Sequence, residues 1–320
     1  MSPGGGPLLL SHPACALHHA PGHPERPERL EAIEAALAAD HRLRELPRRE
    51  PLPATPKRLE AVHESWYVES VYRSGAVSDE GGRGGWLDAD TWLGPGSLAA
   101  ALASAGGGLT AVDAVLGGEF ASAFSLTRPP GHHATASRAM GFCLFNNIAV
   151  AAQAALDRGL ERVAIVDFDV HHGNGTQEIF YERADALYLS CHQSPLYPGT
   201  GAAAERGRGL GEGFTVNVPM AAGGGEAEYL GVFDQVFGPA LHEYRPQLLL
   251  VSAGFDAHAL DPLAQMELSS ESFGTLAGRL RGWAESLCEG RSVWLLEGGY
   301  DLDGLSEGVT AVVTELCASG

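Results

Sequence analysis

The sequence has few basic residues, and this shortage narrows the classes of possible partner. Lys57 is the only lysine among 21 basic residues, and 40 acidic residues give the 320-residue chain a formal charge of −19 at pH 7. Proteins that bind duplex nucleic acid normally carry a basic face, so we expect no nucleic-acid partner. An acidic surface favours cationic substrates such as basic peptide tails or polyamines, although solubility alone also accounts for it.

Cysteines are also few, and long apolar runs are missing. The five cysteines are odd in number, widely spaced and form no Cys-x-x-Cys pair, which argues against a disulfide scaffold and favours a reducing compartment. No basic segment precedes the short run Leu8–Leu10, so we predict no secretory signal. No apolar stretch approaches the roughly 20 residues that cross a membrane. We therefore expect a cytoplasmic protein without a membrane partner.

What the chain does have is an alternation of short apolar runs and Ala- and Leu-rich helical segments. The runs are Ala123–Leu126, Val163–Val170, Ala186–Leu189, Gln247–Ser252 and Ser292–Leu296. The predicted helices are Arg26–Ala39, Ser97–Leu116, Asn146–Arg158 and Glu226–Tyr244. Strands that are apolar throughout and alternate with helices indicate a parallel sheet covered on both faces, an α/β fold.

Nothing in the composition divides the chain. With 45% hydrophobic residues and no linker rich enough to separate two domains, residues 1–320 are expected to form a single domain. The glycine clusters are predicted to be surface loops, at Gly81–Gly85, Gly207–Gly213 and Gly223–Gly225.

Polar segments directly follow most of the predicted strands. They are Arg128–His133, Asp167–Asn174, Asp256 and Glu297–Asp301. In open α/β sheets, ligands bind outside the carboxyl ends of the strands. Four such ends with His, Asp and Tyr therefore predict one shared site.

The segment that closes the second run has the ligand types of a metal site. In an extended chain, residues two apart point to the same side, so Asp167, Asp169 and His171 are expected to converge. Carboxylate and imidazole groups suit zinc, whereas local hydrogen bonds in a strand-end turn are the alternative. Asp256 is the natural further ligand, because a carboxylate at a buried strand end is unfavourable unless it is paired or metal-bound. Two carboxylates and one imidazole leave a zinc position open, as in catalytic sites.

Acid–base candidates come from the segment Arg128-Pro129-Pro130-Gly131-His132-His133. Adjacent histidines are able to reach a metal-bound water, and their proton affinity suits transfer near neutral pH. We expect Asp167 and Asn174 to orient the two rings by accepting their other N–H groups. Structural or solvated histidines are the alternative.

Three further segments are weaker signals. Tyr300 follows two glycines, and its phenol would donate a hydrogen bond to an oxyanion beside a metal, although a tyrosine in such a place more often serves in packing. Phe142 and Tyr197 are expected either to form apolar walls of a narrow channel or to pack in the core. Asn146 or Asn147 suits the N-cap of the helix that follows.

Taken together, these segments resemble the histone deacetylase and acetylpolyamine amidohydrolase family, which has the arginase-deacetylase fold. The resemblance runs from about His12 to Asp301, and its class II branch is the nearer one because Asn174 stands where class I has Asp. The motifs that carry it are RPPGHHA, GFCLFNN, DFDVHHGNGT, YPGTG, SAGFDAHALDP and EGGYD. The implied fold is a three-layer α/β/α domain with a mainly parallel sheet of roughly eight strands.

The resemblance also implies cofactors. One Zn²⁺ per chain is implied, with Asp169, His171 and Asp256 as its ligands. A structural K⁺ beside it is implied, and a second monovalent site near Phe180 is possible. The implied K⁺ ligands, several of them backbone carbonyls, are Asp167, Asp169, His171, Ser190 and Cys191.

The implied reaction is hydrolysis of an N-acyl amide by a metal-activated water. His133 looks like the general base and then acid, His132 with Asp167 like its electrostatic partner, and Tyr300 like the group that polarises the carbonyl. The implied substrate is an acetylated lysine of a peptide or protein, or a small acylated amine. The implied substrate-binding residues are Gly141, Phe142, Tyr197, Asp90 and Leu263.

Alternatives remain open at this level. Leu263 stands where the polyamine-selective class II enzyme has an acidic residue, which weakens an acetylpolyamine substrate without excluding it. Asp90 is either a rim residue or a solvated loop residue. An arginase-like site with two manganese ions would need further ligands at Gly173 and His258, and glycine has none to offer. A non-catalytic protein that binds acyl ligands is a remote alternative, and a homo-oligomer is possible.

Overall fold

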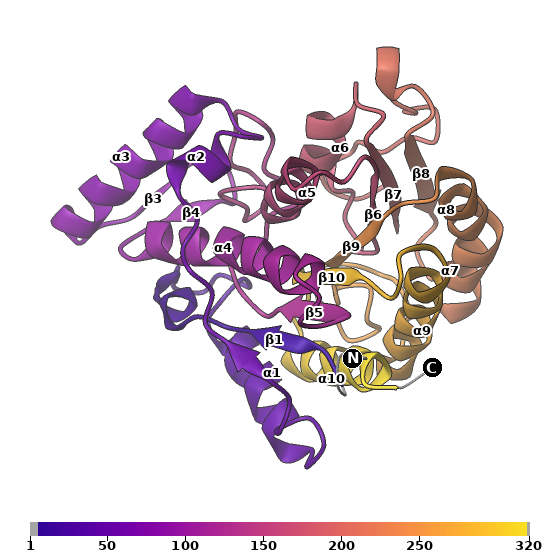
Figure 1. The fold of residues 1–320 in the computed structure, drawn as a ribbon. Helices are drawn as coiled ribbons and strands as arrows, with labels where there is room; N and C mark the ends of the chain where they lie inside the picture. Colours follow the sequence, from indigo (N-terminus) through magenta and orange to yellow (C-terminus); the bar gives the residue numbers. More distant parts are fainter. Residues whose placement is uncertain (1–5, 319–320) are drawn as a thin grey trace.

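The computed structural model describes residues 6–318, and its centre is an eight-stranded sheet in which all neighbouring strands are parallel (Figure 1). The order is β2-β1-β5-β10-β9-β6-β7-β8. Its strands are β1 (Leu8–Leu10), β2 (Arg48–Arg49), β5 (Ser122–Ser125), β6 (Val163–Asp167), β7 (Ala186–Gln193), β8 (Thr215–Met220), β9 (Leu248–Ala253) and β10 (Ser292–Leu296). The predicted α/β class and strand number are confirmed.

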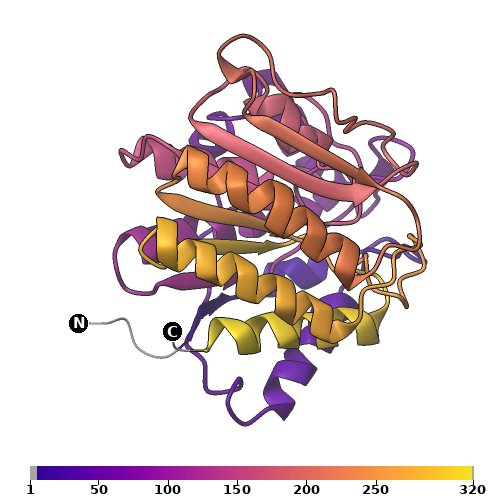
Figure 2. The ribbon, with the colours of Figure 1, turned by 90° about the vertical axis from the view of Figure 1, so that its right-hand side faces the viewer.

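Helices cover both faces of this sheet. Alternate strand residues enter two separate cores, because successive side chains of a strand point to opposite faces. One core packs against α3 (Ser65–Gly81), α4 (Ser97–Leu116) and α5 (Asn147–Asp157). The other packs against α1 (Glu28–Ala39), α7 (Glu226–Val232), α8 (Gly238–Tyr244), α9 (Ser270–Leu287) and α10 (Leu302–Leu316). Figure 2 looks onto this second layer of helices.

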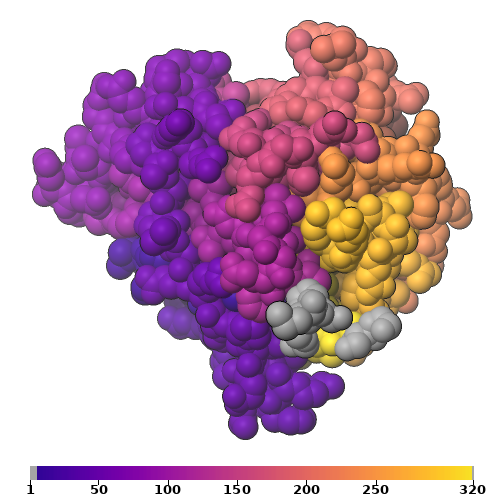
Figure 3. Space-filling view, in the orientation of Figure 1, coloured from indigo at the N-terminus to yellow at the C-terminus, as the bar shows by residue number. Residues whose placement is uncertain are grey.

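Short elements complete the chain. α2 (Pro56–Leu59) and α6 (Asn174–Phe180) are single short helices, and η1 (Pro13–Leu17) and η2 (Gly209–Gly211) are 3₁₀ turns. β3 (Gly85–Trp86) and β4 (Trp92–Leu93) form a small antiparallel pair beside α3 (Figure 1). The space-filling view shows the N-terminal segments on one side of the molecule and the C-terminal ones on the other (Figure 3).

The register of the central strands aligns their carboxyl ends. Asp167 of β6 lies beside Ser252 of β9, and Ser252 lies beside Leu295 of β10. Leu295 in turn pairs with Ser125 at the end of β5. The polar segments that follow these four strands therefore leave the sheet at one edge, which fulfils the condition for a shared site.

Two boundaries differ from the sequence-based expectation, each for a local reason. The run Val163–Val170 does not stay extended: β6 ends at Asp167, whose side chain accepts the N–H of Asp169 in a turn. The predicted helix Glu226–Tyr244 is continuous, but η3 (Phe233–Phe237) between α7 and α8 has π-type hydrogen bonding. Of the glycine clusters, Gly81 ends α3 and Gly85 begins β3, whereas Gly207–Gly213 is loop except for η2.

One expectation about apolar length was wrong. α4 is long and apolar enough to cross a membrane, with a mean hydropathy of 1.5, but 67% of that segment is buried inside the structure. It packs against α5 and the strands β5, β10 and β1 as a core helix. Its composition reflects a position between the sheet and α3, where polar side chains would lose their water.

Candidate active site

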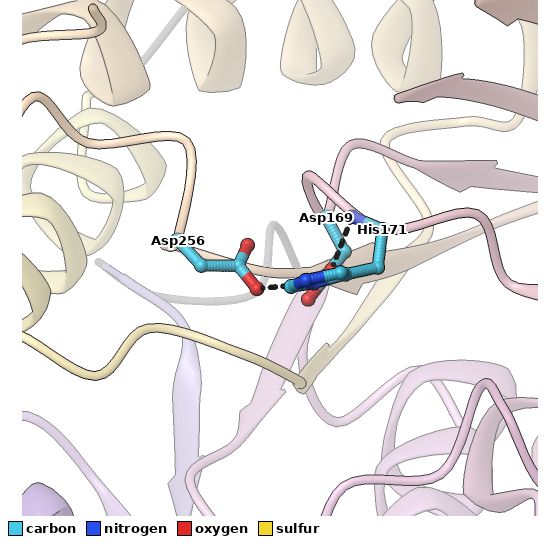
Figure 4. Close-up of side chains that lie close together, drawn as sticks. All are labelled: Asp169, His171 and Asp256. Atoms are coloured by element: carbon cyan, nitrogen blue, oxygen red, sulfur yellow. Dashed lines mark hydrogen bonds and ion pairs between the residues drawn. The ribbon is translucent and has the colours of Figure 1, made fainter. Parts of the chain in front are cut away.

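Three side chains with metal-ligand chemistry meet at the carboxyl edge of the sheet, as Figure 4 shows. Asp169 and His171 lie on the turn after β6, and Asp256 lies on the loop after β9. One ligand atom from each of the three lies within 4.8 Å of the others. The Nδ1 atom of His171 is 3.0 Å from Asp256 Oδ2 and 3.3 Å from Asp169 Oδ1.

Backbone N–H groups fix both carboxylates. Asp256 Oδ1 accepts the N–H of Val170 at 3.0 Å, and Asp169 Oδ2 accepts the N–H of Gly298 at 2.8 Å. A Cβ at Gly298 would collide with both carboxylates, so glycine is required for the β10 loop to pass this close. Local hydrogen bonds, which the sequence offered as the alternative to metal ligation, are thus present and hold the ligands in place.

The three residues fit a zinc ion. Carboxylate oxygens and an imidazole nitrogen are zinc donors, and all three residues are buried. Burial, together with the neighbouring Asp169 carboxylate, raises the pKa of Asp256. Burial alone would lower the pKa of His171, but hydrogen bonds to the two carboxylates raise it to about 10, so a positive charge is favoured at this point. Zn²⁺ would supply such a charge.

Beside these ligands lie the tandem histidines, and neither ring is free to turn. His132 Nδ1 is 3.0 Å from Asp167 Oδ2, and His133 Nδ1 is 2.8 Å from Asn174 Oδ1. The rings are 4.1 Å apart between centroids, and His133 lies 6.0 Å from the ring of His171. Each ring thus presents its Nε2 atom for other contacts, because its Nδ1 atom is already bonded.

The surroundings separate the proton affinities of the two rings. Burial alone would lower the pKa of His132, but the carboxylates of Asp167 and Asp169 raise it well above its ordinary value. Burial and the adjacent His132 lower the pKa of His133 well below its ordinary value. A charged His132 beside a neutral His133 gives the site one fixed cation and one proton acceptor.

Tyr300 approaches from the loop after β10. Its N–H donates to Asp261 Oδ2 at 2.7 Å, and the guanidinium carbon of Arg29 lies 5.1 Å from the centre of its ring. Burial raises the pKa of the phenol well above its ordinary value. The hydroxyl therefore keeps its proton and remains a hydrogen-bond donor.

His133, His171 and Tyr300 line a cavity of about 240 Å³. The lining residues are Asp90, His133, Gly141, Phe142, His171, Leu196, Tyr197, Leu263 and Tyr300. All five expected substrate-binding residues are among them, and Leu196 is an addition that the sequence reading missed. The walls are mainly apolar and aromatic, which suits an aliphatic chain more than a charged one.

Phe142 owes its place in the wall to an unusual turn. Gly141 and Phe142 both have positive φ, +56° and +69°, between the bridged residues Met140 and Cys143. A non-glycine residue in this conformation is strained by about 1–2 kcal/mol. Asp90 and Thr91 side chains compensate by accepting the two N–H groups of the turn, at 3.1 and 3.2 Å. Asp90 thus supports the wall as well as lining the cavity.

The residues implied as potassium ligands lie at the ends of β6 and β7. Asp167 and Ser190 are register partners, and Cys191 follows on β7. Asp167 also accepts the Tyr188 hydroxyl at 3.0 Å, and Ser190 Oγ is 2.9 Å from His192 Nδ1. Phe180, at the end of α6, is buried with the Arg183 guanidinium over its ring.

Some supporting residues escaped the sequence reading. The carboxyl group of buried Glu297 accepts the backbone N–H groups of Gly131 and His132, and Arg29 donates to the carbonyls of Glu297 and Gly299 at 2.6 Å each. Glu25 pairs with Arg128 in the same buried network. Both Arg29 and Glu25 belong to the stretch His23-Pro24-Glu25-Arg26-Pro27-Glu28-Arg29, whose dense charges at the start of a helix were the available signal.

The geometry also bears on the binuclear alternative. Within residues 6–318, Asp169, His171 and Asp256 are the one group of His, Cys, Asp or Glu side chains close enough to share an ion. His258 points elsewhere, with Nε2 3.1 Å from Ser270 Oγ. Neither it nor Gly173 supplies a ligand for a second metal.

Comparison with known proteins points to one family. The model of the histone deacetylase domain matches residues 23–316. The histone deacetylase-like amidohydrolase of Pseudomonas aeruginosa is 46% identical over 290 residues, covering 90% of this chain and 74% of that protein. Human polyamine deacetylase HDAC10 is 39% identical over 97% of this chain, which spans 46% of that protein. The crystal structure of the HDA15 HD domain has a TM-score of 0.91 at 37% identity, covering 98% of this chain and 88% of that one.

Proposed function

This chain belongs to the histone deacetylase family and is an amide hydrolase of the deacetylase class, and we propose that it removes an acetyl group from a lysine side chain at a single zinc site. The expected arginase-deacetylase fold is confirmed by the same structural match. One observation carries the proposal: Asp169, His171 and Asp256 converge, and His171 lines a mainly apolar cavity together with His133 and Tyr300.

Asp169, His171 and Asp256 would hold the zinc ion. When bound there, Zn²⁺ would polarise the amide carbonyl and make a water molecule more acidic. The buried position of the three side chains keeps bulk water from competing for the ion. The hydrogen bonds from the N–H groups of Val170 and Gly298 keep the carboxylates aimed at it.

The remaining chemistry belongs to the chain's own side chains. Neutral His133 accepts a proton from the attacking water and returns it to the amine nitrogen as the C–N bond breaks. Charged His132, held by Asp167, offsets the negative charge that develops on the acyl carbon's oxygen. Acetate and the free amine are the products.

The cavity fits the aliphatic part of a lysine side chain. The rings of Phe142 and Tyr197 and the side chain of Leu263 line it, and Asp90 lies among them as the single carboxylate outside the metal ligands. A neutral acetylated amine loses little by leaving water for such walls, whereas a charged free amine loses more. The product amine is therefore expelled more readily than the substrate.

A small acetylated polyamine is the second candidate. The formal charge of −19 favours cationic substrates, and human polyamine deacetylase HDAC10 is among the relatives. Leu263 argues against it, because an apolar side chain there offers no partner to a second ammonium group. We expect kcat/KM for an acetyl-lysine peptide to exceed that for acetylputrescine or acetylspermidine by about tenfold or more, which corresponds to 1.4 kcal/mol. A parallel assay of acetate release decides, and the reverse order would assign the site to polyamines.

Replacing Tyr300 by phenylalanine tests the role of the phenol. Tyr300 is the residue that the β10 loop contributes to the cavity lining, so loss of its hydroxyl should reduce kcat by about 10²- to 10³-fold, as for a lost oxyanion donor. Zinc content and KM should change little. Steady-state acetate release from an acetyl-lysine peptide measures this. Unchanged turnover in Y300F would remove Tyr300 from the mechanism.

Three further properties are part of the proposal. A K⁺ ion would bind at Asp167, Asp169, His171, Ser190 and Cys191, partly through backbone carbonyls, where Asp167 and Ser190 pair across β6 and β7. A reducing compartment, the cytoplasm, is supported by five free cysteines, of which four are buried. The single eight-stranded sheet supports one catalytic domain over residues 1–320, although residues 1–5 and 319–320 lie outside the described part. Whether the chain forms a homo-oligomer is a matter for measurement in solution.

A further inference from the structure

Behind the tandem histidines lies a buried carboxyl group that no step above uses. Glu297 is the first residue after β10, and its side chain is 0% exposed. Among residues 6–318, no arginine or lysine forms an ion pair with its carboxyl group; Arg29 donates to its backbone carbonyl instead. Burial raises the pKa of Glu297 to about 7. An acid kept in such an unfavourable place calls for a reason.

Its hydrogen bonds supply that reason. Oε2 accepts the N–H of Gly131 at 2.7 Å and the N–H of His132 at 3.1 Å, and Oε1 accepts the hydroxyl of Ser252 at 3.0 Å. One carboxyl group thus ties the loop after β5 to the ends of β9 and β10. No other acceptor is present for these two N–H groups in the described structure.

His132 is consequently fixed at three points. Glu297 holds its N–H, the N–H groups of Gly175 and Thr176 at the start of α6 hold its carbonyl at 3.1 Å, and Asp167 holds its ring. His133 is the next residue, so the same contacts also limit the position of its backbone. Catalytic rates respond to small displacements, because an error of about 1 Å in a reacting group reduces a rate by roughly 10²-fold.

We propose that Glu297 is a positioning residue for His132 and His133, acting through the N–H groups of Gly131 and His132. This inference rests on the proposed deacetylase function and adds a residue to it. In this proposal, Glu297 acts through the position of its acceptor oxygen and not through its charge. The rival explanation is that its negative charge acts on His132 through space, and the two make opposite predictions for two conservative variants.

Glu297→Gln and Glu297→Asp separate place from charge. Glutamine keeps a carbonyl oxygen at the same reach, and its amide N–H₂ is able to donate to Ser252, so only the charge is lost. Aspartate keeps the charge but withdraws the oxygens by one methylene from both N–H groups. We expect kcat of E297Q to stay within about threefold of wild type, and kcat of E297D to fall about tenfold or more, with KM and zinc content unchanged in both. Ser252→Ala, which removes only the hydrogen bond to Oε1, is the matched control, and its kcat should fall less than that of E297D.

The experiment pairs kinetics with a readout that needs no substrate. In ¹⁵N-histidine-labelled protein, the proton between His132 Nδ1 and Asp167 gives an NMR signal that is identified by its absence in His132→Ala. We expect this signal at the wild-type position in E297Q and shifted or broadened in E297D. E297Q as impaired as E297D, or E297D indistinguishable from wild type in both readouts, would overturn the proposal. If wild type released no acetate from any acylated amine, the deacetylase function would fail, while the NMR comparison would still decide the role of Glu297.

Discussion

Replacing Asp256 by alanine should leave the protein folded but unable to retain zinc, and should reduce acetate release to background. The side chain is 0% exposed and supplies one of three converging donors, and its Oδ1 also accepts the N–H of Val170 on the turn that carries Asp169 and His171. Its loss therefore removes a ligand and loosens the other two. The effect should exceed the roughly 10- to 100-fold loss in metal affinity that follows when a group merely supporting a ligand is removed.

Metal analysis and turnover of the same preparations measure this prediction. Wild type should contain one zinc per chain, D256A much less, and removal of zinc from wild type by a chelator should abolish activity until zinc is restored. Asp113→Ala is the matched control, because this acid forms a surface pair with Arg158 and is 65% exposed. Two manganese ions per chain in wild type, or a zinc-free D256A that turns over at the wild-type rate, would contradict the single-zinc site.

The sequence sufficed for the central strands because burial on both faces leaves a continuous apolar pattern. The ends of β5, β6 and β9 were predicted to within three residues and those of β10 without any offset, whereas β7 continues four residues beyond its predicted end. β1, β2 and β8 were not predicted. β1 and β2 have only three and two residues, and β8 alternates buried and half-buried residues with proline near its end, so none of them presents a long apolar run. Short edge strands depend on pairing with a neighbour, which a single segment does not reveal.

The place of the metal-ligand candidates was predicted for a partly wrong reason. An extended chain was expected to point Asp167, Asp169 and His171 to one side, whereas the strand ends at Asp167 and hydrogen-bonded turns bring Asp169 and His171 together. Asp167 faces His132 instead. Ligand chemistry and order along the chain are readable from residue types, but the turn geometry follows from side-chain acceptors capping particular N–H groups.

Supporting residues were the hardest to foresee, because their partners are backbone groups far along the chain. Glu297 accepts N–H groups 165 and 166 residues away, and Arg29 donates to carbonyls 268 and 270 residues away. The sequence does not show which backbone N–H or C=O group a distant side chain will bind. Asp261 is a similar case, since it accepts the N–H of Tyr300 across 39 residues. Such contacts become visible only once the loops after β9 and β10 are placed side by side.

The second large effect is expected at His133, and it separates proton transfer from metal binding. His133→Ala should retain one zinc per chain, because the three converging donors are untouched, yet kcat should fall by about 10²- to 10⁴-fold through loss of the general base. The loss of kcat should be smaller in His132→Ala if His132 serves as a fixed charge, because neutral His133 remains to accept the proton. His41→Ala, on a side chain that is 81% exposed, is the matched control.

The direction of the His133 effect follows from the two rings' surroundings. Asn174 contacts His133 through a neutral amide oxygen, whereas Asp167 contacts His132 through a carboxylate. His132 therefore has the higher proton affinity and is charged, and neutral His133 is the ring that accepts the proton of the attacking water. Acetate release from an acetyl-lysine peptide, with zinc measured in each variant, tests this order. A larger loss in H132A than in H133A would exchange the two roles, and full activity in H133A would mean that the proton is transferred elsewhere.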